Sequence, residues 1–260
     1  MTSYKTILLE QKSENYVVVT LNRPGELNAL SRSMREELTS CFQQLETMPA
    51  LKAVVLTGGD FTFSSGGDIK EMTALREAEV ELYFDSIHTC LRQIIFFPRP
   101  VIAAVSGLAI GGGLNLAVSC DLIAASETAI FSHPELRFGM NPLLSPLQRR
   151  VGIAKAKEIA LLGEPIPANE ALRIGLINKV TPPERLMEEA EDMAREISKR
   201  SAKAIEVIKK TSNAALQMDL NSTLALEFEL SSFLFARPER RNYMRDFLLA
   251  EDMRKRKRRL

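Results

Sequence analysis

The amino-acid sequence predicts an α/β fold that is followed by a helical C-terminal region. Two observations carry this prediction. Short apolar runs rich in β-branched residues alternate with helix-patterned segments up to about Pro182, and only helix-patterned segments follow beyond that point. Because strands that alternate with helices are joined by right-handed crossovers, the sheet is expected to be largely parallel.

The N-terminal half supplies most of the expected strands. Lys5–Glu10 and Tyr16–Leu21 are separated by a polar turn, which predicts a hairpin. Apolar residues at helical spacing predict a helix over Ser31–Thr47, with Ser31 as its start signal. Continuous apolar runs, typical of strands covered on both faces, occupy three later segments: Lys52–Thr57, Val101–Val105 and Leu122–Ala125.

The second half is expected to be mainly helical. Gly107–Ser119 is glycine-rich and then apolar, which predicts a loop that opens a buried helix. Apolar stripes on the last helices, such as Leu224, Phe228 and Phe235, need a surface to cover, either their own core or another subunit. The helix-patterned segments after Pro182 are Pro183–Lys199, Ala202–Leu216, Ser222–Ala236 and a final one that runs to about Met253.

Composition excludes several classes of protein. The chain has 260 residues, of which 45% are hydrophobic and 26% charged, an ordinary balance for a globular protein. The net charge of +1 gives no general attraction to nucleic acid or membranes. The three cysteines are far apart, which is typical of core residues in a reducing compartment. We expect a cytoplasmic protein, because the N-terminus resembles no targeting peptide and no apolar run approaches the roughly 20 residues of a membrane helix.

The basic run Arg254–Arg259 is the one strongly biased segment. We interpret it as a solvated, frayed tail. Contact with an anionic ligand or with nucleic acid is the alternative.

Several catalytic signatures are absent from the sequence. It has only two histidines, no G-x-S-x-G turn, no Cys/His spacing for a metal and no phosphate-binding loop of the G-x-x-x-x-G-K-[ST] type. The segment Gly107–Gly113 follows a strand but lacks the G-x-G-x-x-G spacing of dinucleotide-binding proteins. We therefore expect neither a serine hydrolase nor a metal or nucleotide site.

Two glycine-rich segments remain as candidates for a site. Phe63–Lys70 follows the strand Lys52–Thr57, and Gly111–Gly113 follows the strand Val101–Val105 and precedes a helix. Ligands of open α/β sheets bind beyond the carboxyl ends of strands, and glycines there let backbone N–H groups approach closely. Two such amides on one oxygen would form an oxyanion hole. From spacing alone, glycines that only make tight turns are an equally good interpretation.

These segments lie within an ordered set of motifs: Leu21–Pro24 with Leu27–Leu30, Phe63–Met72, Pro100–Gly107, Gly111–Gly113 and Cys120-Asp121. Together the motifs resemble those of the crotonase, or enoyl-CoA hydratase/isomerase, superfamily. The resemblance covers nearly the whole chain, and the ordered combination is much more specific than any one motif. The resemblance implies a spiral of β-β-α turns over residues 1–195. It also implies a helical region, 196–260, that builds homotrimers or homohexamers.

The resemblance also implies roles for individual residues. Gly67 and Gly112 match the positions whose N–H groups hold the thioester carbonyl. The family binds no permanent cofactor or metal, and coenzyme A enters as part of the substrate; a membrane or nucleic-acid partner is not expected. The implied coenzyme A contacts are Arg23, Leu27, Ala29, Ser65, Gly66, Asp68, Ile69 and Lys70.

The catalytic carboxylates depart from the family pattern. Hydratases of the family hold and activate water with two glutamates, and this chain has Asn115 at the first position and Glu135 at the second. An amide orients water but cannot shuttle its proton, so efficient hydration is in doubt. A single glutamate at the Glu135 position resembles the isomerases of the family. A surface carboxylate at Glu135, and a plain buried amide at Asn115, are the alternatives.

Three further features bear on the acyl site. Leu143-Leu144-Ser145-Pro146 replaces small residues of the family and is expected to narrow or reshape the acyl pocket. In an extended segment His133 would share a face with Glu135 and tune it, although a structural histidine is the simpler interpretation. The helix after Lys70 carries Tyr83 and His88 and is expected to line the pocket. Asp85, on the same helix, or Glu79 is a candidate to replace the missing carboxylate.

The leading hypothesis is an enoyl-CoA hydratase/isomerase in which Glu135 is the acid–base, with double-bond isomerisation preferred. The alternatives are a 2-enoyl-CoA hydratase in which Asn115 positions water, an acyl-CoA decarboxylase or thioester hydrolase, and a binding protein that has lost catalysis.

Overall fold

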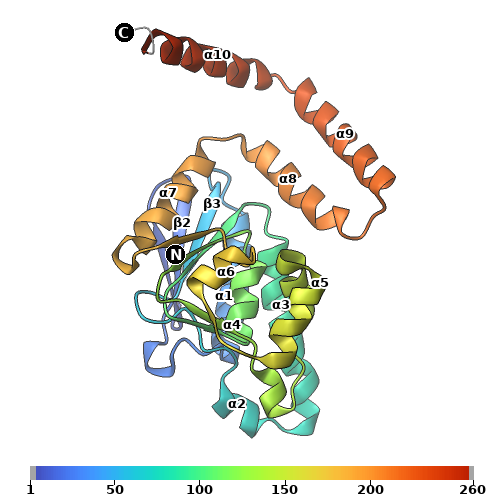
Figure 1. The fold of residues 1–260 in the computed structure, drawn as a ribbon. Helices are drawn as coiled ribbons and strands as arrows, with labels where there is room; N and C mark the ends of the chain where they lie inside the picture. The colour runs from blue at the N-terminus through green and yellow to red at the C-terminus, as the bar shows by residue number, and fades with distance from the viewer. Residues whose placement is uncertain (1–3, 258–260) are drawn as a thin grey trace. The chain divides into compact units, whose positions relative to one another are not determined.

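The larger part of the chain is built on a six-stranded sheet. The computed structural model describes residues 4–257, and the chain divides into two compact units after Arg200. The strands lie in the order β1-β2-β3-β4-β6-β9 (Figure 1). Only the β1–β2 pair is antiparallel, so the expected hairpin and the expected parallel sheet are confirmed. The bounds are β1 (Ile7–Gln11), β2 (Tyr16–Leu21), β3 (Ala53–Thr57), β4 (Val101–Val105), β6 (Leu122–Ser126) and β9 (Lys179–Thr181).

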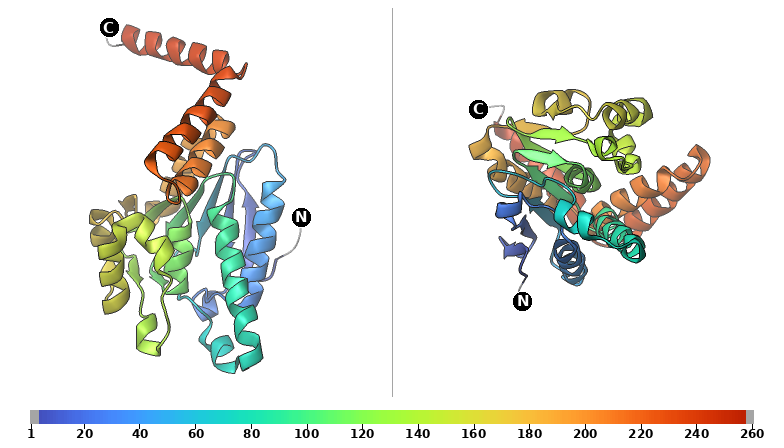
Figure 2. Two further views of the ribbon diagram at one scale, coloured as in Figure 1. Left: turned by 90° about the vertical axis from the view of Figure 1, so that its right-hand side faces the viewer. Right: turned by 90° about the horizontal axis from the view of Figure 1, so that it is seen from below.

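Successive residues of the central strands face two different cores. In β3, Val54 and Leu56 pack into one cluster, whereas Ala53 and Val55 pack into the other. This follows from the two-residue period of a strand. The first core is covered by α1 (Arg32–Glu46), α3 (Val80–Ile95) and α4 (Gly112–Ser119), and the second by α7 (Leu186–Ser198). Figure 2 shows α1 and α3 running side by side on their face of the sheet.

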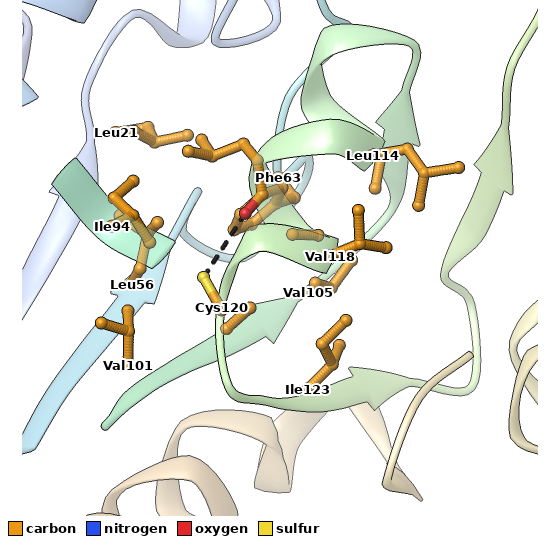
Figure 3. Close-up of a cluster of buried hydrophobic side chains, with 14 of the residues drawn as sticks. Leu21, Leu56, Phe63, Ile94, Val101, Val105, Leu114, Val118, Cys120 and Ile123 are labelled. Atoms are coloured by element: carbon orange, nitrogen blue, oxygen red, sulfur yellow. Dashed lines mark hydrogen bonds between the residues drawn. The ribbon is translucent and has the colours of Figure 1, made fainter. Parts of the chain in front are cut away.

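The centre of the first core surrounds α4. Leu114, Leu116 and Val118 of this helix are buried in this core. Figure 3 shows Leu114 and Val118 in one cluster with Leu56 of β3, Val105 of β4 and Ile123 of β6. The Cys120 thiol, just after the helix, donates a hydrogen bond to the Leu116 carbonyl over 3.4 Å. The three cysteines are buried and form no disulfide in the part of the chain that the structure describes, as expected of core residues. The buried position of α4 fixes its N-terminus, where the candidate site lies.

A small second sheet corrects the sequence-based expectation for the segment before α4. Gly107–Ser119 was expected to begin as a loop, but Leu108–Ile110 forms strand β5 in a three-stranded sheet with order β5-β7-β8. A three-residue strand is too short to show a two-residue period. The partners are β7 (Ile130–Ser132) and β8 (Ile166–Pro167). The remaining elements of this unit are α2 (Ile69–Ala74), α5 (Leu144–Leu162), α6 (Ala168–Arg173), η1 (Pro24–Glu26), η2 (Glu77–Glu79), η3 (Glu135–Phe138) and η4 (Pro183–Arg185).

The second unit, from residue 201 on, consists of helices alone in the part the structure describes. These are α8 (Ala202–Ala215), α9 (Leu220–Ala236) and α10 (Arg240–Lys257), and α8 packs against α9. Apolar side chains of α9 such as Phe228 and Phe235 are more than half exposed. The side chains of the basic run 254–259 lie outside the described residues. Among the described helices, none combines the length and apolar character needed to cross a membrane.

Candidate active site

The loop after β3 is held against the N-terminus of α4 by backbone hydrogen bonds. Ser64 N–H donates to the Leu108 carbonyl over 2.9 Å, and Ile110 N–H donates to the Ser64 carbonyl over 3.0 Å. A Cβ on Gly113 would lie 2.3 Å from the Ser64 carbonyl oxygen, and one on Gly66 would lie 2.6 Å from the Ile110 carbonyl oxygen. These two glycines are therefore required for the close approach of the loop to the helix.

This approach brings the amides of Gly67 and Gly112 to the same place. A Cβ on Gly66 would lie 3.1 Å from the Gly112 nitrogen, and one on Gly112 would lie 3.4 Å from the Gly67 nitrogen. Gly112 is the first residue of α4, so its N–H has no partner within the helix. Across residues 4–257 neither amide has a backbone acceptor. Two free donors, one of them at a helix N-terminus, can bind a partly negative oxygen.

A cavity of about 40 Å³ adjoins the two amides. Its walls are mainly apolar residues of α3 and α4, together with Leu30 and Arg35. Arg35 is buried; its guanidinium donates to the Leu30 carbonyl, to Glu71 over 2.8 Å and to Ser86 over 2.8 Å. The complete lining is Leu30, Arg35, Gly67, Tyr83, Ile87, Cys90, Leu91, Gly112, Asn115 and Leu116.

Two titratable side chains in the cavity wall are held in their neutral forms. Burial raises the pKa of the Cys90 thiol to about 12. Burial also raises the pKa of the Tyr83 hydroxyl, although the Arg35 guanidinium, 4.5 Å from the ring centroid, acts in the opposite direction. A neutral thiol is a poor nucleophile, so the cavity is not suited to covalent catalysis by Cys90.

Glu135 lies beside Gly111, immediately before the Gly112 amide. It is the first residue of η3, and its side chain is 13% exposed. Its Oε1 atom lies 3.0 Å from the position that a Cβ on Gly111 would occupy. Gly111 has φ +52, and its lack of a side chain leaves room for this carboxylate. Glu135 does not line the 40 Å³ cavity; it approaches the amide pair from the Gly111 side.

Asn115 does line the cavity, one helical turn after Gly111. Its N–H donates to the Gly111 carbonyl over 2.9 Å, which places its side chain in the first turn of α4. The side-chain Oδ1 atom is buried and has no hydrogen-bond partner among the described residues. An unpaired buried acceptor is costly, so a donor from a ligand or a water molecule would be stabilised there.

The expected coenzyme A segments contact one another. Arg23 donates to Asp68 over 2.9 Å and to the Ala29 carbonyl over 2.7 Å. Ser65 N–H donates to the Leu27 carbonyl over 3.0 Å. Asp68 caps α2, accepting from the N–H groups of the next turn. Gly66 is buried in the turn, whereas Leu27, Ile69 and Lys70 are exposed beside it.

Several other residues that were candidates for the acyl site lie outside the wall of this cavity. Leu143 is the N-cap of α5, Leu144 and Pro146 lie in its first turn, and none of the three lines the cavity. Their effect on the shape of an acyl pocket stays a prediction. Asp85 is exposed, and Glu79 is bound to Arg76 on the surface. Neither lines the cavity or replaces the missing carboxylate there. Tyr83 lines it as expected, but His88 does not.

The apolar lining residues had not been selected from the sequence. Ile87, Cys90 and Leu91 follow Tyr83 at four, seven and eight residues, which places all four on one face of α3. That spacing was a usable signal. The contribution of Leu30 and Arg35 was not predictable, because it depends on how α1 packs against α3.

Comparisons with known proteins agree with this geometry. The family model described as enoyl-CoA hydratase/isomerase matches residues 11–254. A probable enoyl-CoA hydratase of Rhizobium meliloti is 40% identical over 205 residues, covering 78% of this chain and 79% of that protein. A short-chain-enoyl-CoA hydratase of Clostridium acetobutylicum is 37% identical over 203 residues, covering 76% and 77%. The crystal structure of an enoyl-CoA hydratase from Bacillus anthracis superposes with a TM-score of 0.91 at 30% identity, covering 95% and 97%. The chain therefore has the crotonase fold and belongs to the enoyl-CoA hydratase/isomerase family of enzymes.

Proposed function

We propose that this enzyme binds an acyl-CoA thioester with its carbonyl oxygen at the Gly67 and Gly112 amides and uses Glu135 as a single acid–base. One observation carries the proposal. A carboxylate, Glu135, stands beside the amide pair, whereas the residue in the cavity wall at the first glutamate position of family hydratases is an amide, Asn115. The arrangement supports proton transfer next to a stabilised enolate.

The reaction we favour is double-bond isomerisation of a 3-enoyl-CoA. Glu135 accepts a proton from the α-carbon, and the electron pair of that C–H bond forms an enolate whose charge rests on the thioester oxygen. The two amides donate to that oxygen, a contribution worth about 10²–10³ in rate for each donor. Glu135 then returns the proton to the γ-carbon, which gives the 2-enoyl-CoA. One carboxylate is sufficient for this sequence, and no water is consumed.

Hydration of a 2-enoyl-CoA is the second candidate, and two observations favour it. The buried Oδ1 atom of Asn115 lacks a donor, and it lies in a cavity of about 40 Å³, which is large enough for a water molecule. The relatives cited above are also named as hydratases. In this alternative Asn115 orients the water, and Glu135 alone accepts a proton from that water as its oxygen adds to the β-carbon and then donates this proton to the α-carbon.

Two other activities would use the two amides but need fewer of the side chains of the site. Decarboxylation of an acyl-CoA needs only the oxyanion hole, and a thioester hydrolase would use the same hole with a water nucleophile. A binding protein without catalysis is the remaining alternative.

Coenzyme A would bind along the linked surface formed by the two expected segments. The exposed Leu27 and Ile69 side chains offer apolar area for an adenine ring, and Lys70 offers a cation for a phosphate. The helical region 196–260 is proposed to build a homotrimer or homohexamer, because its exposed apolar side chains need cover.

A panel of thioesters separates these activities. The protein is incubated with short 3-enoyl-, 2-enoyl-, malonyl- and saturated acyl-CoA, and the products are separated by liquid chromatography against authentic isomers and identified by mass spectrometry. Isomerisation predicts conversion of the 3-enoyl-CoA without uptake of water. A dominant hydrated product would make hydration the function, and loss of carbon dioxide from the malonyl thioester would indicate decarboxylation. Binding without turnover of any thioester would contradict the proposal.

An Asn115→Glu variant tests whether this position decides the reaction type. It restores the second carboxylate, so we expect hydration of 2-enoyl-CoA to rise relative to isomerisation. Asn115→Gln is the matched control, because it has the same length without the charge. An unchanged product ratio in both variants would show that Asn115 does not set the reaction.

A further inference from the structure

The imidazole of His133 is a buried partner of Glu135. His133 directly follows strand β7, and its side chain is fully buried. Its Nδ1 atom lies 3.1 Å from Oε1 and 3.1 Å from Oε2 of Glu135. Its other nitrogen, Nε2, is also buried and has no partner among residues 4–257. Among the described residues, the polar contact of this ring is therefore with the carboxylate alone.

The two distances favour one tautomer of His133. In a neutral imidazole one nitrogen donates and the other accepts. A proton on Nε2 would leave a buried donor unpaired and turn the Nδ1 lone pair toward two carboxylate oxygens. A proton on Nδ1 provides a hydrogen bond shared by both oxygens and leaves only an unpaired acceptor at Nε2. A proton on both nitrogens would again bury an unpaired Nε2–H.

We propose that His133 is a positioning residue that orients the Glu135 carboxylate through an Nδ1–H hydrogen bond. This inference rests on the proposed role of Glu135 as the acid–base. A donor equidistant from both oxygens restricts rotation of the carboxylate group. The restricted carboxylate has Oε1 against the backbone of Gly111, where the absence of a side chain leaves space for it.

The neighbouring backbone fixes the ring and the carboxylate as one unit. The Ser132 carbonyl accepts from Gly111 N–H over 2.8 Å, which ties the end of β7 to the turn before the Gly112 amide. The Ser132 hydroxyl donates to the Gly163 carbonyl over 3.0 Å, on the other side of the segment. His133 thus links the acid–base to the same turn that carries one oxyanion donor. Misplacement of a reacting group by about 1 Å can cost roughly 10²-fold in rate.

The tautomer can be measured without any assay of activity. The chain has only two histidines, so a ¹⁵N–¹H spectrum of labelled native protein contains two imidazole patterns, and His88→Gln identifies that of His133. We expect a protonated Nδ1 and an unprotonated Nε2 at neutral pH. The Nε2–H tautomer at His133 would overturn the proposal, because no donor would then face Glu135.

Two variants test the consequence for catalysis. His133→Asn keeps a side-chain N–H near the position of Nδ1, whereas His133→Leu removes the donor at similar size. The readout is exchange of the α-protons of butyryl-CoA in D₂O. We expect His133→Leu to lower the maximal exchange rate by about 10- to 100-fold with KM nearly unchanged, and His133→Asn to recover most of it.

The outcomes separate this inference from the proposed function. If the native protein does not exchange these protons, the acid–base role of Glu135 fails. If the native protein exchanges them and His133→Leu does so equally fast, the positioning role of His133 fails. Equal losses in both variants would show that His133 is only structural.

Discussion

The two halves of the candidate site are built in different ways. The half at Gly67 and Gly112 consists of backbone N–H groups, fixed by a loop and a buried helix. The other half consists of side chains, Glu135 with His133 on one side and Asn115 on the other. In the mechanism we propose, the backbone half determines which intermediate is stabilised, and the side-chain half determines what happens to it.

The largest effect is expected from the side-chain half. Glu135→Gln keeps the size of the residue but removes the base, and we expect turnover of a 3-enoyl-CoA to fall by about 10²–10⁴ with little change in binding. Steady-state kinetics measures the turnover, and calorimetry measures the binding of the thioester. Glu158→Gln, an exposed carboxylate on α5, is the matched control. A variant that keeps native turnover would remove Glu135 from the mechanism.

The backbone half is tested by adding one methyl group. A Cβ on Gly112 meets ordinary contacts, the nearest being 3.4 Å from the Gly67 nitrogen, so Gly112→Ala should fold but obstruct the space at the amide pair. We expect a loss of about 10²–10³ in rate, comparable to the loss of an oxyanion donor. In Gly113→Ala the Cβ would meet the Ser64 carbonyl at 2.3 Å, so that variant should lose stability instead. Thermal melts and steady-state kinetics of the two variants distinguish obstruction of the amide pair from loss of stability. Equal losses of stability in Gly112→Ala and Gly113→Ala would contradict this distinction.

The same contrast explains what could be predicted from the sequence. The strands β3 and β4 and the glycine segments after them are local patterns, and the resemblance gave them a shared role before the structure was known. The structure agrees with their expected proximity, because it brings Gly67 and Gly112 together. The short strand β5 was missed, since three residues carry no periodic signal.

The side-chain half was less accessible to sequence reasoning. The sequence indicated that His133 and Glu135 share a face if extended, yet η3 begins at Glu135, and the contact between them depends on the turn at Pro134. Glu79 pairs with Arg76 and Asp85 is exposed, so neither lies in the cavity wall, and this placement depends on how α3 packs. Contacts made by tertiary packing have no fixed spacing in the chain.

A smaller effect, on stability, is expected at the helix cap beside Gly67. Burial opposes the charged form of Asp68, but hydrogen bonds from Arg23 and from the N–H groups of α2 outweigh it and hold the pKa of this carboxyl below its ordinary 3.8. The resulting stabilisation is present above pH 3.8 and is lost as the pH falls through the lowered pKa. Asp68→Asn should therefore lower the free energy of unfolding by about 2 kcal/mol at neutral pH and leave it unchanged at the lowest pH. Urea melts across pH measure this; a penalty independent of pH would contradict it.

The smallest effect is expected at Cys90, the thiol in the cavity wall. Because burial raises the pKa of this thiol to about 12, it stays protonated at any pH at which the enzyme is assayed. Cys90→Ala should keep turnover of the same order, and iodoacetamide at pH 8 should not modify Cys90 in the folded protein, as peptide mass spectrometry would show. Cys41, whose pKa burial raises to about 11 and which does not line the cavity, is the matched control. If Cys90→Ala abolished turnover while Cys41→Ala did not, the chemistry would pass through a covalent thiol. In that case the proposed division of the site would be wrong. The backbone half would not simply hold an enolate whose proton the side-chain half moves.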